Sequence, residues 1–286
     1  MIILLFGSNG QVGLQIQKLL KNKKNFYSLS SKDCNFLNED SINKYVLTLK
    51  PNIIINAAAY TDVRNAEVDK KSAIKINGHA PGYIAKLAKK INAKLIHYST
   101  DYVFDGKKSQ SYSEKDITNA LNIYGKSKLI GENKIINSGC SYIIIRTSWI
   151  ISENGKNFLL TMLDLFKKKK DIYVVGNQFG YPTSAEFLAK TTLEIIKKKL
   201  YFEGILNITN SGKTSWFKLA SFIYKEGLKR KIINNKVSIH KIKYINHKEK
   251  LKRPENSCLN NSKLKRIYNI KPNNWQIEVR KIISKL

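Results

Sequence analysis

A glycine-rich loop directly follows the first apolar run of the chain. Residues 1–6 are Met-Ile-Ile-Leu-Leu-Phe, residues 7–13 are Gly-Ser-Asn-Gly-Gln-Val-Gly, and apolar side chains then recur at helical spacing over residues 14–20. In a strand-loop-helix unit, such glycines permit a tight turn and let backbone N–H groups approach a pyrophosphate at the helix N-terminus. We therefore expect a parallel α/β sheet that begins at a dinucleotide-binding turn; a purely structural turn is the alternative.

Short apolar segments alternate with longer amphipathic segments through the first half of the chain. The expected strands are residues 1–6, 25–30, 52–57, 93–99 and 141–147, and the expected helices are residues 11–22, 39–49, 79–92 and 122–137. This alternation is typical of βαβ units around a parallel sheet. Beyond residue 150 the rhythm is less regular, and we expect helices at 156–169, 184–198 and 214–228 and strands at 172–175, 204–208 and 237–242.

These segments predict two closely joined lobes in an α/β chain of 286 residues. Residues 1–149 are expected to form a Rossmann-type doubly wound parallel sheet that binds a dinucleotide, with residues 184–203 packing back onto it. Residues 150–183 and 204–286 are expected to form a smaller α/β substrate-binding lobe. Because no internal repeat and no Gly/Ser-rich linker separates the two parts, we expect them to pack directly against each other.

The chain carries 51 basic and 21 acidic residues, a formal net charge of +30. Such a balance raises the question of nucleic acid. The lysines are nevertheless spread in short groups along the whole chain, mostly at expected helix ends, where cations suit the helix dipole. A chain-wide excess of Lys, Asn and Ile explains this distribution better than a binding patch does. We expect no nucleic-acid partner. The positive electrostatic field of the chain nevertheless favours an anionic small-molecule substrate.

Other features of the composition argue against several classes of protein. No apolar run approaches the roughly 20 residues that span a bilayer, and the apolar start lacks the basic segment of a signal peptide, so we expect no membrane association. Cys34, Cys140 and Cys258 are widely spaced, which suits a reducing cytoplasm rather than a disulfide framework. Neither the cysteines nor the histidines have the spacing of a zinc site, and no metal-ligand set is expected.

Tyr124 and Lys128 lie four residues apart at the start of an expected helix, so they face one ligand from the same side. A phenol with an ordinary pKa of about 10 is a poor acid at neutral pH. We expect the neighbouring ammonium to lower that pKa, so that the tyrosine exchanges a proton with a substrate oxygen. Thr100 follows the expected strand 93–99 at the carboxyl edge of the sheet, where its hydroxyl would orient the same oxygen. A chance Tyr/Lys spacing and an ordinary strand-end threonine are the alternatives.

The segment after the second expected strand bears on the choice of cofactor. Dinucleotide sites often place an acidic residue there to bind the adenosine ribose, but residues 27–32 read Tyr-Ser-Leu-Ser-Ser-Lys. Ser30, Ser31 and Lys32 would tolerate a 2′-phosphate, which favours NADPH and leaves NADH open. A solvated loop charge is the alternative interpretation of Lys32.

Seven motifs carry a family resemblance along nearly the whole chain. They are Gly-x-x-Gly-x-x-Gly at 7–13, Asn-Ala-Ala-Ala-Tyr-Thr at 56–61, His-Tyr-Ser-Thr-Asp-Tyr-Val-Phe-Asp-Gly at 97–106, Tyr-Gly-Lys-Ser-Lys at 124–128, Arg-Thr-Ser-Trp at 146–149, Gln-Phe-Gly-Tyr-Pro-Thr at 178–183 and Arg-Pro-Glu-Asn-Ser at 253–257. Together they resemble the dTDP-4-dehydrorhamnose reductases, a family of extended short-chain dehydrogenases. The last three motifs lie outside the cofactor motif and therefore distinguish this family from other short-chain dehydrogenases.

The resemblance implies reduction of dTDP-4-dehydro-6-deoxy-L-mannose to dTDP-L-rhamnose, with hydride passing from the nicotinamide to sugar C4 and a proton from Tyr124. It implies a cofactor site made of Gly7, Gly10, Gln11, Val12 and Gly13 at the pyrophosphate, Asn35 and Phe36 near the adenine, Ala59, Tyr60, Thr61 and Tyr98 along the cleft, and Lys128 at the ribose. It implies a substrate site made of Thr100, Asp101, Trp149 and Arg253. Taken alone, Trp149 would be a core aromatic and Arg253 a loop charge, but a diphosphate needs such a guanidinium.

The chain departs from the resembled family in places. Asn35 stands where that family often has an acidic residue, which leaves the adenosine-side preference open. Asn177 stands where the family often has Asp before the Gln of the later loop. Some bacterial members dimerise through a magnesium ion held by glutamates. Here Gln15 occupies the first of those places, although Glu186 fits the second. Both Mg²⁺ binding and a homodimer therefore stay open.

Three other functions compete with the reductase. A related nucleotide-sugar epimerase or dehydratase would share the glycine loop and the Tyr/Lys pair, but it would recycle its nicotinamide without net consumption. A non-catalytic regulatory homologue would be expected to have lost Tyr124, Lys128 or Thr100, and the chain retains all three. An RNA-associated basic protein would bind polynucleotide in a manner that weakens steeply with salt.

Overall fold

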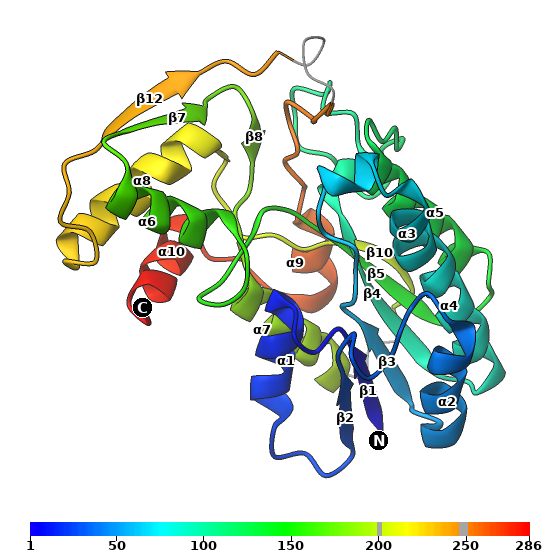
Figure 1. The fold of residues 1–286 in the computed structure, drawn as a ribbon. Coiled ribbons are helices and arrows are strands. Elements are labelled where there is room, and N and C mark those ends of the chain that lie inside the picture. Colours follow the sequence, from blue (N-terminus) through cyan, green and yellow to red (C-terminus); the bar gives the residue numbers. More distant parts are fainter. Residues whose placement is uncertain (199–201, 246–250) are drawn as a thin grey trace.

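The computed structural model describes residues 1–198, 202–245 and 251–286. In this part of the chain a parallel sheet of six strands forms the centre of the molecule, in the order β10-β5-β4-β3-β1-β2 (Figure 1). Its strands are β1 (Ile3–Phe6), β2 (Phe26–Leu29), β3 (Ile53–Asn56), β4 (Lys94–Thr100), β5 (Tyr142–Thr147) and β10 (Gly204–Asn207). The fold is α/β, a doubly wound sheet of the Rossmann type.

Helices cover both faces of this sheet. One face holds α1 (Gln11–Leu20), α7 (Ala185–Lys197) and α9 (Ser262–Tyr268), and the other holds α2 (Glu39–Leu49), α4 (Ala80–Lys90) and α5 (Ile123–Ile136), as Figure 1 shows. Ile3 and Leu5 of β1 pack on the first side, whereas Leu4 and Phe6 pack on the second. Since both faces are buried, the strands are continuous apolar runs rather than alternating ones.

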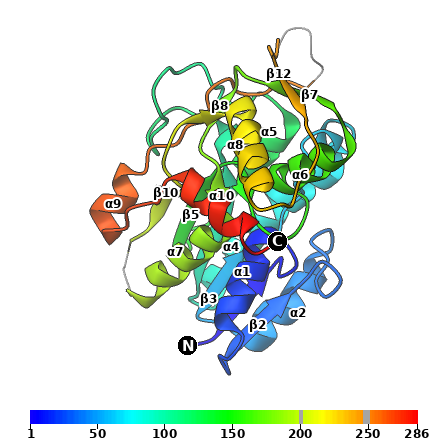
Figure 2. The same cartoon turned by 90° about the vertical axis from the view of Figure 1, so that its left-hand side faces the viewer.

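The second lobe lies beyond the carboxyl edge of the sheet. It contains β6 (Ile150–Ile151), α6 (Phe158–Lys168), β7 (Asp171–Val175), β8 (Phe179–Gly180), β9 (Thr183–Ser184), β11 (Thr214–Ser215), α8 (Trp216–Lys229), β12 (Ser238–Ile242) and α10 (Trp275–Ile283). Phe166, Leu219, Ile223 and Val279 are fully buried in its own core. Figure 2 shows α10 between α8 and the start of α7, where the two lobes meet.

The expected strands and helices of the first half are confirmed, with shifts of at most two residues at their ends. Three short helices were missed between β3 and α4: η1 (Asn65–Glu67), α3 (Lys70–Ile74) and the π-helix η2 (Lys75–His79); the 3-10 helix η3 (Asp101–Val103) after β4 was missed as well. The helices α9 and α10 were also missed.

The proposed boundary at residue 204 needs a correction. Strand β10 belongs to the central sheet, where Ile205 pairs with Ile144 and Leu206 with Ile145. Its apolar side chains complete the edge that β5 would otherwise expose. Leu264 and Tyr268 of α9 are buried in the same core as β1, so this part of residues 204–286 packs with the first lobe.

No helix in the described residues is long and apolar enough to cross a membrane.

Helix α5 packs unusually closely on the chain before it. A Cβ atom added at Gly131 would lie 2.2 Å from the backbone oxygen of Asn77, and one added at Gly78 would lie 2.9 Å from Ile130. The buried backbone of η2 therefore touches α5 directly. This contact fixes the position of the helix that carries Tyr124 and Lys128.

We predict that Gly131→Ala lowers the free energy of unfolding by about 1–3 kcal/mol, because the new methyl group meets backbone rather than a movable side chain. The loss outweighs the gain of about 1 kcal/mol in helix propensity. Chemical denaturation measures the change. Asn133→Ala, at an exposed position of the same helix, is the control and should change stability by about 0.5 kcal/mol or less. An unchanged or higher stability of Gly131→Ala would contradict the close packing.

Candidate active site

The loop after β1 has the shape of an anion cradle. Gly7 has a φ of +81°, and a Cβ there would lie 2.5 Å from the backbone nitrogen of Ala58. A Cβ at Gly13 would lie 2.0 Å from the oxygen of Gly7, whereas one at Gly10 meets nothing closer than 3.4 Å. A side chain at Gly7 or Gly13 would therefore collide with the backbone of the turn. At Gly10 there is room beside the loop backbone. Helix α1 begins at Gln11 without a side-chain cap, so its first N–H groups suit an anion.

This loop lies where the strand order reverses, between β1 and β3, and ligands of doubly wound sheets bind at such a point. Val12 is buried beneath the loop. The side chain of Gln11 accepts a hydrogen bond from the Ser152 hydroxyl at 2.9 Å, which links the loop to the second lobe. The turn therefore opens toward the junction of the two lobes.

The loop after β3 forms the other wall of the expected cofactor cleft. Ala59 and Tyr60 are half-buried, and Thr61 is exposed. The buried side chain of Asn77 accepts a hydrogen bond from the Tyr60 backbone nitrogen at 2.9 Å and donates to the Tyr60 carbonyl at 3.0 Å. It also donates to the Ser127 hydroxyl at 3.0 Å. Asn77, which the motifs did not indicate, joins this wall to α5; a π-helix in such a place often marks a functional region.

The turn after β2 holds an acidic residue that the sequence motifs did not indicate. Asp33 accepts hydrogen bonds from the backbone nitrogen and the hydroxyl of Ser30, at 2.8 and 2.7 Å. These bonds lower the pKa of Asp33 and close the turn. Asn35 is exposed beside this turn, but the ring of Phe36 packs edge-on against Phe6 in the core. Phe36 therefore offers its backbone, not its ring, to a ligand.

Helix α5 begins at the carboxyl edge of the sheet. Its N-cap, Asn122, accepts a hydrogen bond from the Gly125 nitrogen and donates to the Lys252 carbonyl, both at 2.9 Å. The cap thus ties the start of the helix to the chain just before Arg253. Lys128 is buried and donates to the Tyr98 carbonyl on β4 at 2.7 Å. Burial lowers the pKa of Lys128 to about 8, against the opposing effect of Glu132.

Tyr98 differs from the expectation that it lines the cleft. Its ring points to the opposite face of the sheet, where its hydroxyl meets the Thr192 hydroxyl of α7 at 2.6 Å. The ring therefore points away from Lys128 on α5, and only the Tyr98 carbonyl contacts the lysine.

Thr100 and Tyr124 meet at the end of β4. The Thr100 hydroxyl lies close enough to Tyr124 to act on its pKa, and it donates a hydrogen bond to Oδ1 of Asp101 at 3.0 Å. Burial raises the pKa of Tyr124 to about 12, with the Thr100 hydroxyl acting in the opposite direction. The expectation that Lys128 brings this pKa toward neutrality is therefore wrong for the protein alone: the phenol is held protonated. A protonated phenol is the form that donates a proton to an alkoxide.

Asp101 is a buried carboxyl beside this pair. Burial raises its pKa to about 7, although the hydroxyls of Ser257 and Thr100 oppose the shift. Its Oδ2 atom is buried without a hydrogen-bond partner among the described residues. A buried acceptor of this kind suits a ligand that brings a donor.

Arg253 lies just before a segment that is held by backbone hydrogen bonds to the loop after β4 and to β8. The Asn256 nitrogen donates to the Gly106 carbonyl at 3.2 Å, and the Ser257 nitrogen donates to the Phe179 carbonyl at 2.8 Å. Burial raises the pKa of Tyr102, and the charge of Arg253 lies close enough to oppose that shift. The ring of Tyr102 in turn packs edge-on against Tyr124. The structure thus brings Arg253 near the Tyr124 side of the site.

Trp149 joins the site to the core of the second lobe. Its backbone is left-handed, with a φ of +46°, at the turn between β5 and β6. Its ring stacks on Trp216 with 3.5 Å between ring centroids, and its edge faces Gly180. One face of the indole is therefore already covered, and only the other face is left for a sugar.

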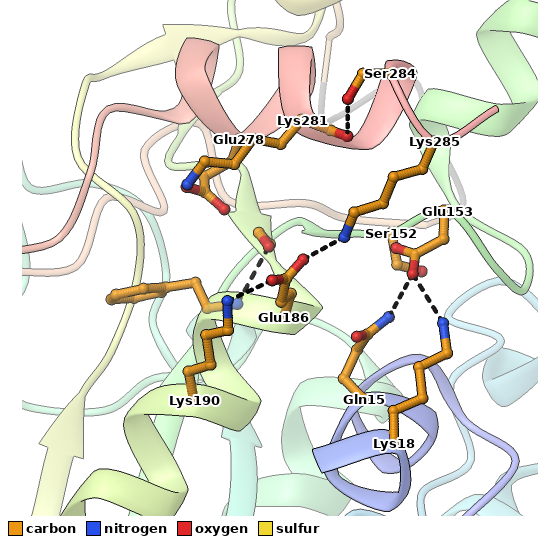
Figure 3. A network of polar contacts seen from close by, with 12 residues as sticks. Gln15, Lys18, Ser152, Glu153, Glu186, Lys190, Glu278, Lys281, Ser284 and Lys285 are labelled. Atoms are coloured by element: carbon orange, nitrogen blue, oxygen red, sulfur yellow. Dashed lines mark hydrogen bonds and ion pairs between the residues drawn. The ribbon is translucent and has the colours of Figure 1, made fainter.

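The places implied for a magnesium ion hold ion pairs instead, as Figure 3 shows. Both carboxylate oxygens of Glu186 contact ammonium groups at 2.5 Å, one from Lys190 and one from Lys285. These contacts lower the pKa of Glu186 to about 2. The amide nitrogen of Gln15 donates to Glu153 at 2.8 Å. In this structure the Glu186 carboxylate is thus paired with two lysines, and Gln15 offers an amide where a glutamate would offer the charged oxygen ligands that magnesium prefers.

Comparison with known proteins agrees with the fold. The family model described as the RmlD substrate binding domain matches residues 1–286. The dTDP-4-dehydrorhamnose reductase of Aggregatibacter actinomycetemcomitans is 36% identical over 286 residues, which cover 98% of this chain and 97% of the relative. The enzyme of the same name from Escherichia coli strain K12 is 36% identical over 293 residues, which cover 100% and 98%.

Solved structures give the same result. The crystal structure of dTDP-4-dehydrorhamnose reductase from Bacillus anthracis in complex with NADP has a TM-score of 0.92 and 30% identity, and the match covers 100% of both chains. The ortholog from Clostridium acetobutylicum has a TM-score of 0.92 and 34% identity, with 100% of this chain and 99% of the other covered. On the family model, the relatives and the fold together, this chain belongs to the dTDP-4-dehydrorhamnose reductase family.

Proposed function

We propose that the protein reduces the 4-keto group of dTDP-4-dehydro-β-L-rhamnose to give dTDP-L-rhamnose at the expense of NADPH. The observation that carries this proposal is the meeting of Thr100 and Tyr124 hydroxyls at the sheet edge, with Lys128 one helical turn behind them. Two hydroxyls on one oxygen position suit a carbonyl that becomes an alkoxide. The curated relatives that carry the same name support the choice of substrate.

The residues of the chain divide the chemistry between them. NADPH, when bound, supplies the hydride that reduces sugar C4. Thr100 and Tyr124 hold the carbonyl oxygen, and Tyr124 gives its proton to that oxygen as negative charge develops. With a pKa of about 12, Tyr124 is neutral until this moment, so the proton is always available. The charge of Lys128 then stabilises the phenolate that remains.

The glycine loop fits a dinucleotide. The open side of Gly10 and the uncapped start of α1 would receive the pyrophosphate, and Ala59, Tyr60 and Thr61 would line the cleft. Ser31 and Lys32 are exposed beside the turn that Asp33 closes, and they would accept a 2′-phosphate. This arrangement and the NADP complex of the Bacillus anthracis relative favour NADPH over NADH.

The sugar nucleotide would lie between the lobes. Oδ2 of Asp101 would accept a sugar hydroxyl, the free face of Trp149 would cover the ring, and Arg253 would pair with the diphosphate. The three cysteines are buried and unpaired, which suits a reducing cytoplasm. A homodimer stays compatible with this arrangement, and neither a membrane nor a nucleic acid has a part in it.

The test is turnover of the keto sugar nucleotide with each reduced cofactor, with identification of the product. One reduced cofactor should be oxidised for each dTDP-L-rhamnose formed. Turnover without net oxidation would instead indicate an epimerase or dehydratase.

Tyr124→Phe should lower kcat by about 10²–10⁴-fold, because only the proton donor is removed. The dissociation constant for NADPH, measured by fluorescence titration, should stay within about twofold. Tyr83→Phe, which loses a hydroxyl bonded to Asn43 on the outer helices, is the control. A parallel loss of NADPH binding in Tyr124→Phe would contradict the assigned role.

Asp101→Asn should stabilise the protein at about pH 8 by an amount on the order of 2 kcal/mol. The folded-state pKa of Asp101 is raised to about 7 from 3.8, so the native state favours the protonated carboxyl. Its contribution to stability is full below about pH 4 and is lost as the pH rises through about 7. Denaturation at several pH values should therefore show the gain at high pH and none at low pH. A variant that is less stable at high pH would refute the assignment.

Chelation should leave the activity and the melting temperature unchanged, because Lys190 and Lys285 already neutralise Glu186. Assays with EDTA and with added Mg²⁺ measure this directly. Loss of activity on chelation, with recovery on addition of Mg²⁺, would show that the ion-pair interpretation is wrong.

A further inference from the structure

A second buried charge pair lies directly behind the reacting groups. The Glu132 carboxylate on α5 accepts three hydrogen bonds from Arg146 on β5: from Nε at 3.0 and 3.2 Å, and from Nη2 at 2.6 Å. The two side chains are only 1% and 3% exposed. The guanidinium also lies over the ring of Phe104, 5.1 Å from its centroid. Such a pair is costly to bury and stabilises a fold little compared with apolar packing, so a role in the site is the better explanation.

The pair is connected to the reacting residues by the strand register. The Ser99 hydroxyl donates to Oε1 of Glu132 at 2.5 Å. Ser99 pairs with Arg146, and its neighbour Thr100 pairs with Thr147. Glu132 thus fixes the backbone of β4 at the residue next to the Thr100 hydroxyl. It does so from the same helix that carries Tyr124.

Glu132 also faces Lys128, which lies one turn earlier on α5. Among the titratable groups, Glu132 on the same helix acts on the pKa of Lys128, and Lys128 in turn acts on the pKa of His97 on β4. His97 is buried, and its pKa is held well below the ordinary value by burial and by Lys128, so it is neutral. Glu132 is therefore the negative charge that opposes the effect of burial and favours the protonated lysine.

We infer that Glu132 is a positioning residue of this enzyme: fixed by Arg146 and Ser99, its carboxylate sets the place of Thr100 and keeps Lys128 charged. The inference rests on the proposed function for the roles of Thr100 and Lys128. It adds a group that touches neither substrate nor cofactor and acts through both reacting elements.

The test is Glu132→Gln, measured by the pH dependence of NADPH binding and of kcat. In the wild type both should decline as Lys128 loses its proton, at about pH 8. In the variant the decline should move to lower pH by about one unit. At neutral pH kcat should fall at least about tenfold, because the Thr100 hydroxyl is no longer held in place. KM for the sugar nucleotide should stay within about threefold.

Loss of one partner leaves Arg146 buried and unpaired, which can cost about 3–5 kcal/mol and prevent folding. A triple variant, Ser99→Ala with Glu132→Met and Arg146→Met, removes the charges together and keeps the volume. It should fold and move the decline in the same direction but by less than Glu132→Gln does, because the Arg146 cation is removed together with the Glu132 carboxylate. The control is Glu226→Gln, since Glu226 pairs with Arg280 at 3.0 Å and Arg280 lies 5.1 Å from the Phe222 centroid, in the second lobe. It should lose stability only.

The outcomes separate the two proposals. A folded Glu132 variant with wild-type pH dependence and wild-type kcat would overturn the positioning role, as would an equal shift in Glu226→Gln. A wild type that binds NADPH but does not reduce the keto sugar would overturn the proposed function, while the pH dependence of NADPH binding would still decide the role of Glu132.

Discussion

The contact of α5 with the ends of β4 and β5 is the constraint on which the rest of the structure depends. Lys128 is buried against the Tyr98 carbonyl, and Glu132 is bound to Arg146 one turn further on. On its other side α5 meets the backbone of η2, because Gly131 leaves no room for a side chain. The helix is thus fixed from two directions. Its first turn then has to present Tyr124 beside Thr100.

The same burial sets the acid-base properties of the site. It raises the pKa of Tyr124 to about 12 and that of Asp101 to about 7, and it lowers that of Lys128 to about 8. All three shifts favour the neutral form of the group. A reductase benefits from this, since its tyrosine has to remain protonated until an alkoxide appears.

Much of the fold could be predicted because its strands are buried on both faces. A continuous apolar run such as the three isoleucines that begin β3, bounded by turn residues, is typical of a strand buried on both faces. The polar segment that forms α3 and η2 gave no periodic signal, because its helix is held by Asn77 and by contact with α5 rather than by an apolar face. The edge strand β10 was assigned to the wrong lobe, since its partner β5 lies far away in the sequence.

The positions of the expected site residues were easier to predict than the directions of their side chains. Motif spacing indicated that Thr100, Tyr124 and Lys128 lie at one edge of the sheet, and they do, whereas the directions of Tyr98 and Phe36 depend on which face of the sheet each ring meets. The direction of the pKa shift of Tyr124 was predicted wrongly, because a sequence motif does not show how deeply the phenol is buried.

The most direct test of the reductive chemistry is to follow a deuterium label. NADPH deuterated at the transferable position of the nicotinamide should yield dTDP-L-rhamnose with deuterium at C4 and none elsewhere, with loss of the label from the cofactor. Label that stays in the cofactor pool during turnover, or enters the sugar at another carbon, would contradict the account.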